Sequence, residues 1–287
     1  MPISKHFPTW RTLRITVATL VITGVLAIAG AAAVMWSGWY DVSAIGQHWQ
    51  ASYSVLEWVK RQSVRRHAGG RTPVMTPSQL WRGAVVFREQ CLECHGAPGI
   101  APHAIGLSMQ PQPGPLVHML QRWEPAEIYW IVSNGIKMSG MPAWRYRMSD
   151  SDLWAVTAMV MHLPDLSPQE YAVLQDSAQE TPALVEQTVL RKPNAPRGKI
   201  AISQYACQSC HHIPGTIGGD VQVGPNLEHY GTRQYIAGYL PNTPTNLARW
   251  LTSTHEVKPL SAMPQLGVSE ADAFDIAAYL LDADQAK

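Results

Sequence analysis

One pentapeptide, Cys-x-x-Cys-His, occurs twice in this chain and constrains its fold more than any other feature. The first copy is Cys91–His95 and the second is Cys207–His211. Together the two copies contain all 4 cysteines of the 287-residue chain. We therefore interpret each copy as a separate site that the surrounding residues must fold around.

The motif is typical of covalent haem attachment. Its two thiols add to the vinyl groups of the haem, and the adjacent histidine becomes a ligand of the iron. The sequence thus predicts two covalently bound haems c, one held by Cys91, Cys94 and His95 and the other by Cys207, Cys210 and His211.

Other uses of a Cys-x-x-Cys pair fit this chain less well. A thioredoxin-like redox pair needs a βαβ context, and neither copy follows a strand-like run. A zinc ribbon would combine the two pairs, but Cys91 and Cys207 are much farther apart than zinc ligands usually are. Disulfide bonds would give no reason for a histidine after each second cysteine.

The residues around the two motifs follow one order, which we interpret as an internal repeat. A short helix is expected before each motif, then a loop, a second helix, a loop with Met-Pro, and a terminal helix. In the first module, residues 99–115 are expected as a loop, residues 124–134 as a helix, and the terminal helix is expected from an N-cap at Asp150 or Ser151 to His162. In the second module, a helix is expected at 245–253 and the terminal helix after an N-cap at Ser269.

This order of elements resembles class I cytochrome c over roughly residues 76–165 and 196–284. The resemblance implies an all-α fold with two such domains in tandem. In that family a methionine thioether from the loop after the middle helix is the sixth iron ligand. Carried onto this chain, the axial pairs are His95 with Met141 and His211 with Met263. Met138 is the alternative to Met141, but only Met141 precedes a proline as Met263 does.

A proline carbonyl supports the proximal histidine in the same family. The segment 224–227, Gly-Pro-Asn-Leu, is similar to the family segment whose proline carbonyl accepts the Nδ1 proton of that histidine. The resemblance implies that Pro225 has this role for His211. The first module has Pro113 and Pro115 in the corresponding place, and the sequence leaves open which of them supports His95.

The second module also resembles the cytochrome c domain that is fused to subunit II of some bacterial cytochrome c oxidases. The resemblance rests on residues 223–227, 240–247 and 257–264, together with Arg233 and Trp250. It implies that Arg233 and Trp250 hold haem propionates, which need a charged donor when desolvated. The alternative is a surface arginine and a core tryptophan. The chain has no cysteine pair left for a copper-binding domain, so we do not expect it to be subunit II itself.

The N-terminal region reads as a membrane anchor. Ile15–Trp36 contains no charged residue, and about 20 such residues span a bilayer as a helix. Lys5, Arg11 and Arg14 precede it, whereas no lysine or arginine lies between Ser37 and Val59, which predicts a cytoplasmic N-terminus. The alternative is a signal peptide cleaved near the Ala31–Ala33 run, but the apolar segment is longer than a usual signal core of about 7–15 residues.

A connector follows the anchor. Trp49, Tyr53, Leu56 and Val59 recur at helical spacing, and a basic end follows that includes Arg71. That basic end is either a solvated helix end or a surface for anionic lipid or a membrane subunit, and the sequence leaves both open. The expected domains are 1–40 (start and anchor), 41–75 (connector), 76–165 (cytochrome c domain 1), 166–195 (linker, with one helical turn near Tyr171) and 196–287 (cytochrome c domain 2).

Charge and ligands together predict an electron carrier rather than an enzyme. The formal net charge of +1 gives no nucleic-acid footprint. Two methionine-ligated haems leave no open iron position for a substrate, and neither module carries the basic surface of a long-range shuttle. We expect a single-pass protein of a bacterial inner membrane with periplasmic haem domains, which passes electrons to or within a terminal oxidase or other respiratory complex. A dihaem peroxidase-like enzyme is the alternative; no sequence feature favours a haem-based sensor.

Overall fold

The computed structural model describes residues 9–70, 72–114, 116–117, 122–178, 191–219, 221 and 223–282. Three residues used above, Lys5, Arg71 and Pro115, lie outside this set, as does much of the expected linker. The chain divides into two compact units, Met1–Leu56 and Glu57–Lys287.

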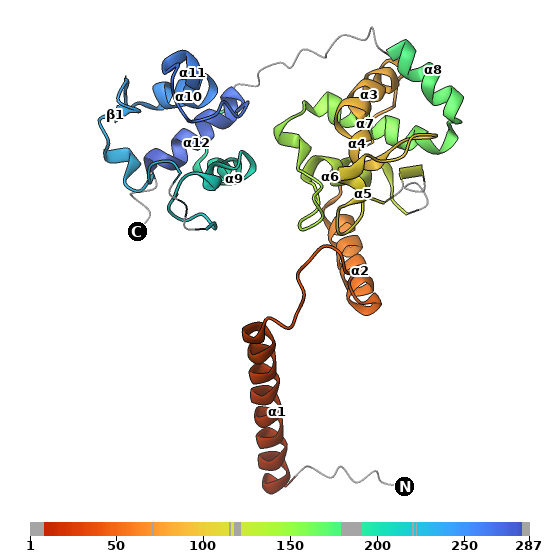
Figure 1. Ribbon diagram of the computed structural model, residues 1–287, viewed down its shortest axis with the longest axis vertical. Coiled ribbons are helices and arrows are strands. Elements are labelled where there is room, and N and C mark those ends of the chain that lie inside the picture. The colour runs from red at the N-terminus through yellow and green to blue at the C-terminus, as the bar shows by residue number, and fades with distance from the viewer. Residues whose placement is uncertain are drawn as a thin grey trace. The chain divides into compact units, whose positions relative to one another are not determined.

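The first unit contains one long apolar helix, α1 (Trp10–Ser37) (Figure 1). The Thr9 side chain caps its start by accepting a hydrogen bond from the backbone N–H of Thr12, and Gly38 ends it in the left-handed conformation. The most apolar part of α1 has a mean hydropathy of 2.3, and none of it is buried. α1 is therefore long and apolar enough to cross a membrane, as predicted from the uncharged run.

The amphipathic helix predicted in the connector is α2 (Gln50–His67). Its C-terminal half belongs to the second unit, where Val64 is buried. The basic side chain of Arg65 lies 3.7 Å from the Glu127 carboxylate, and the His67 ring stacks on Trp130. This end of α2 thus packs on the first module through Val64, while Arg65 and Arg66 stay exposed.

The first module is built from short helices. In chain order they are α3 (Pro77–Gln90), α4 (Leu92–His95), α5 (Ala104–Leu107), α6 (Pro125–Asn134), η2 (Trp144–Tyr146), α7 (Asp150–His162), η3 (Leu163–Asp165) and α8 (Pro168–Ala178).

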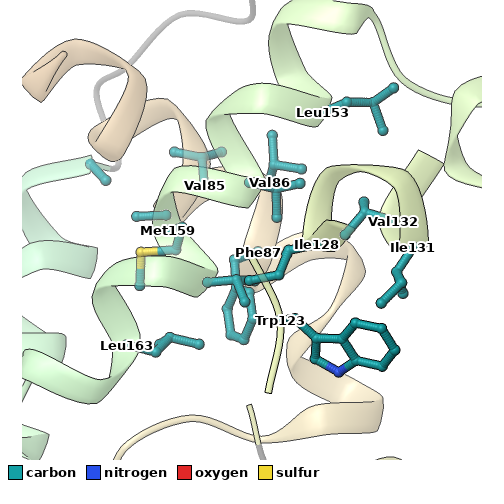
Figure 2. Packing of buried hydrophobic residues seen from close by; sticks show 14 of the residues in the cluster. Val85, Val86, Phe87, Trp123, Ile128, Ile131, Val132, Leu153, Met159 and Leu163 are labelled. Atoms are coloured by element: carbon teal, nitrogen blue, oxygen red, sulfur yellow. The ribbon is translucent and has the colours of Figure 1, made fainter. Parts of the chain in front are cut away.

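Their buried side chains form one hydrophobic cluster, the first core. Figure 2 shows Phe87 of α3 near its centre, among side chains from α6 and α7. Ile128, Ile131 and Val132 of α6 are buried in this cluster, so this face of the helix points into the core.

The second module repeats the pattern with a small hairpin added. Its elements are α9 (Ala195–Gln204), η4 (Cys207–Ser209), η5 (Tyr230–Thr232), β1 (Tyr235–Ile236), β2 (Leu240–Pro241), α10 (Pro244–Thr252), α11 (Thr254–Val257) and α12 (Glu270–Asp282). The strands β1 and β2 are antiparallel, with Ile236 opposite Leu240. The buried side chains of this module form a separate cluster, the second core.

The same helix crossing occurs in both modules. In each, the helix that leads into the Cys-x-x-Cys-His motif crosses the terminal helix at a glycine, Gly83 in α3 and Gly198 in α9. A Cβ atom on Gly83 would lie 2.0 Å from the carbonyl oxygen of Ala155, and one on Gly198 would lie 2.0 Å from that of Asp275. Only glycine permits backbones to approach this closely. The crossing fixes the start of each motif against the core.

Several local expectations need correction. Ser149, not Asp150 or Ser151, caps α7, because the Ser149 hydroxyl accepts a hydrogen bond from the N–H of Asp152. The segment 99–115 is not all loop, since it contains α5. The single turn expected near Tyr171 is the longer helix α8, and the buried Tyr171 joins the first core. By contrast, Ser269 caps α12 as predicted.

Candidate haem sites

The first candidate site is built around His95, the last residue of α4. Its Nδ1 atom lies 3.3 Å from the backbone oxygen of Gly114. A carbonyl oxygen only accepts, so Nδ1 carries the proton and Nε2 keeps a free lone pair for a metal. Burial lowers the pKa of His95, although the Gly114 carbonyl opposes this shift. The neutral imidazole required of a ligand is therefore favoured.

The carbonyl that supports His95 thus belongs to Gly114, whereas the sequence had left two prolines as the alternatives. Its carbonyl lies between Pro113 and Pro115 in the chain, and Pro115 lies outside the described residues. The looser sequence match in this segment explains why no single proline was identified.

The second candidate site has the same arrangement around His211. The Nδ1 atom of His211 lies 2.8 Å from the backbone oxygen of Pro225, the residue that the resemblance implied. The backbone at Gly224 passes close to the ring, because a Cβ atom there would lie 2.5 Å from Cε1 of His211. The loop thus holds the imidazole from one side, and the Nε2 atom again has a lone pair free for iron.

The chemistry of the cysteines argues against a redox dithiol. None of the four, Cys91, Cys94, Cys207 and Cys210, is in a disulfide, and all are partly exposed. Burial, with a smaller contribution from Cys94, raises the pKa of Cys91 to about 12. Burial likewise raises the pKa of Cys207 to about 11. Redox-active thiols instead have a pKa below that of free cysteine.

The two methionine loops share a pair of hydrogen bonds. The backbone N–H of Met141 donates to the hydroxyl of Ser139 at 3.3 Å, and that of Met263 donates to the hydroxyl of Ser261 at 3.2 Å. In both loops the serine N–H closes a turn on the carbonyl three residues earlier. The shared motif is therefore Ser-x-Met-Pro rather than Met-Pro alone. The serines stand in the sequence at matching positions, so a longer comparison of the repeats would have found them.

Met141 and Met138 differ in their surroundings. Met141 is partly buried against the first core, whereas the side chain of Met138 is 96% exposed. Met263 is partly buried against the second core, as Met141 is against the first. A methionine that would hold a haem has to face the protein interior rather than solvent, so these surroundings favour Met141 over Met138.

Arg233 and Trp250 lie in the second module but in different environments. The Arg233 guanidinium donates to the backbone oxygen of Asn226 and lies over the Tyr230 ring at 5.0 Å. Trp250 is buried in the second core. Arg233 is thus held near the loop that supports His211, while the surroundings of Trp250 are those of a core residue. Their propionate roles stay predictions.

The donor chemistry of both motifs fits haem c. Each motif offers two thiols and a histidine whose Nε2 is free to ligate, and Met141 and Met263 stay the predicted further ligands. Among the residues that the structure describes, no group of three or more His, Cys, Asp or Glu side chains is arranged to hold a metal ion in another way.

Comparisons with known proteins agree with this chemistry over part of the chain. The family model for cytochrome c oxidase, cbb3-type, subunit III matches residues 78–160. A cytochrome c oxidase subunit 2 from Alkalihalophilus pseudofirmus is 33% identical over 87 residues, 30% of this chain and 25% of the relative. The chain therefore covers about a quarter of that relative. No solved structure matches the chain.

The family match covers the first Cys-x-x-Cys-His motif, the Met141 loop and most of α7. The family match and the chemistry around His95 agree. Residues 78–160 are similar to a cytochrome c-type domain.

Proposed function

We propose that this chain is a membrane-anchored dihaem electron carrier or electron-transfer subunit, which passes electrons to or within a respiratory oxidase complex. The observation that carries the proposal is the repetition of one ligand set. His95 and His211 each place Nδ1 on a backbone carbonyl, and Met141 and Met263 each sit in a Ser-x-Met-Pro turn.

Haem c supplies a reversible one-electron couple when it is bound. The chain supplies the ligands and holds them. The carbonyls of Gly114 and Pro225 fix the tautomer of each proximal histidine and raise its basicity. The thioethers of Met141 and Met263 would hold the iron as further ligands, and a soft thioether would favour reduced iron and raise the potential.

The proposed partner follows from the comparisons. The matching family model and the partial relative are both described as cytochrome c oxidase subunits. Neither match covers the whole chain, and a carrier held at the membrane needs no strongly basic steering surface. We therefore place the protein beside a terminal oxidase, with α1 as a single anchor, the N-terminus in the cytoplasm and the haem modules in the periplasm.

Counting the haems tests the first part of the proposal, that the chain carries two of them. Pyridine haemochrome spectra of the purified protein are expected to give two haems c per chain, with mass spectrometry finding one on each motif. Replacing Cys207 and Cys210 by alanine is expected to leave one haem, and replacing Cys91 and Cys94 is the matched variant for the other motif. A wild-type protein with a single haem, or with two free thiols, contradicts the dihaem assignment.

Membrane attachment tests the second part. N-terminal sequencing of the membrane-purified protein is expected to find Ile15–Trp36 retained, and washing with salt is expected to leave the protein in the membrane. A mature chain that begins near Val34 and is released by salt would show a cleaved signal peptide instead. Purification from membranes in mild detergent then identifies the redox partner by what remains bound.

A further inference from the structure

Two segments that lie next to the proposed haem sites, one in each module, are in direct contact. Tyr146 and Arg147 follow the Met141 loop of the first module, and Gln204 and Tyr205 precede Cys207 of the second. The Tyr205 hydroxyl lies 3.1 Å from the backbone oxygen of Tyr146. The Arg147 guanidinium donates to the backbone oxygen of Gln204 at 2.8 Å. These hydrogen bonds join residues that are 57 and 59 positions apart in the chain.

Ring contacts reinforce the hydrogen bonds. The Arg147 guanidinium lies 4.3 Å from the centroid of the Tyr205 ring, a cation–π distance. The Tyr146 and Tyr205 rings meet edge to face with centroids 6.5 Å apart. The Tyr146 side chain packs against the second core although its backbone belongs to the first module. The contact is therefore apolar, aromatic and hydrogen-bonded at once.

Tyr205 is held firmly on its own side. It is only 1% exposed, and its hydroxyl also lies 3.0 Å from the Asp272 carboxylate. The backbone N–H of Ser269 donates to the same hydroxyl at 3.3 Å. Burial and the nearby Asp272 raise the pKa of Tyr205, while the hydrogen bonds from Ser269 oppose the shift. The phenol therefore stays protonated at neutral pH, and its single proton is shared between the Tyr146 oxygen and the Asp272 carboxylate.

We propose that Tyr146, Arg147, Gln204 and Tyr205 form a fixed joint between the two haem modules, and that electrons pass between the modules across it. The proposal rests on the proposed dihaem function. A fixed joint keeps the Met141 loop against the segment that leads into Cys207, so one electron leaving a reduced haem of one module reduces the oxidised haem of the other. Without it, each module would exchange electrons separately with partners.

The joint predicts an effect that does not depend on haem. Arg147→Ala in the first module removes the bond to Gln204 and the cation–π contact, so the second module is expected to open locally. Hydrogen exchange of backbone amides at 204–206 and at Ser269, read by mass spectrometry in the full chain, is expected to be about tenfold faster, the factor for losing one hydrogen bond to a charged group.

Arg145→Ala is the matched control. Arg145 lies in the same 3₁₀ turn, and its guanidinium donates to Asn134 within the first module. Arg145→Ala removes the same charge but none of the contacts of the joint, so the exchange rates of the second-module amides are expected to be unchanged. Unchanged exchange in Arg147→Ala, or an equal increase in both variants, overturns the joint.

Electron exchange tests the functional half. Photoreduction supplies the fully oxidised protein with half an electron equivalent per chain. The oxidation states of the two haems are then followed as the electron redistributes between them. Arg147→Ala and Tyr205→Phe are expected to slow redistribution, whereas Tyr279→Phe, which breaks a similar bond to Pro214 inside the second module, leaves it unchanged. Equal rates in all variants overturn the electron path. A haem count below two would instead mark a failure of the dihaem function.

Discussion

Gly198 crosses Asp275 so closely that a Cβ atom on the glycine would lie 2.0 Å from the carbonyl oxygen of the aspartate. Gly83 stands in the same relation to Ala155 in the first module. These crossings pack α9 on α12 and α3 on α7, and α3 and α9 are the helices that lead into the two Cys-x-x-Cys-His motifs. The glycines are therefore part of what positions both sites, although neither touches a proposed ligand.

Gly198→Ala is expected to destabilise the protein, because the added methyl group cannot fit against backbone atoms that are held in helices. Overpacking of this kind costs about 1–3 kcal/mol. Thermal or denaturant unfolding measures the loss. Gly219→Ala is the control, since a Cβ atom there meets nothing within 4 Å, and it is expected to change stability little. Equal stability of the two variants would show that α9 and α12 can separate without cost.

Asp275 predicts a pH dependence of stability. Its side chain is fully buried, and burial by itself raises its pKa. Hydrogen bonds from Arg197 and from the Asn194 N–H, with the charge of Arg191, outweigh burial and hold the pKa below its ordinary value. A lowered folded-state pKa means that the ionised carboxylate stabilises the fold above about pH 4 and that this contribution is lost as the pH falls below it.

Asp275→Asn removes that contribution. The variant is expected to be less stable than wild type at pH 7, and the difference is expected to shrink as the pH is lowered from 4 toward 2. Denaturant unfolding at pH 4 and at pH 2 measures this difference in stability. Asp282→Asn, at the end of α12, serves as the control. A stability difference that stays constant with pH would show that Asp275 does not titrate in this window.

The helices and the candidate ligands were within reach of sequence reasoning, and the contacts between them were not. Periodicity and caps predict α6, α10 and α12 to within a residue or two, because these signals are local. The length of α8 was underestimated, because its short apolar pattern is completed only by packing against α3 in the first core. The joint at Tyr205 was missed because its partners lie far away in the chain.

Gly224→Ala tests how the second site holds its histidine. A Cβ atom at position 224 would lie 2.5 Å from Cε1 of His211, so the ring must rotate or the loop must move. The absorption spectrum of one haem is expected to change while the other stays as in wild type. Gly114→Ala is the matched control, because a Cβ atom there meets nothing within 4 Å and its carbonyl still serves His95. Two unchanged haem spectra in Gly224→Ala would contradict the proposed role of the glycine.

The axial methionines decide between a carrier and an enzyme. If Met141 and Met263 both ligate iron, both haems are low-spin and each shows the weak near-infrared band of a thioether–iron bond. Met141→Ala is expected to remove the band of one haem and Met263→Ala that of the other. Each change is also expected to open its haem to carbon monoxide and to lower its potential, because a soft thioether favours reduced iron.

Met138→Ala is the control. The Met138 side chain is 96% exposed, so its replacement is expected to leave both bands intact. Loss of a band in Met138→Ala but not in Met141→Ala would move the ligand to position 138. The wild-type protein is expected not to bind carbon monoxide at either haem, since both sixth positions are filled. Carbon monoxide binding by the native protein would mean that one iron has an open position, and the peroxidase-like alternative would then replace the carrier.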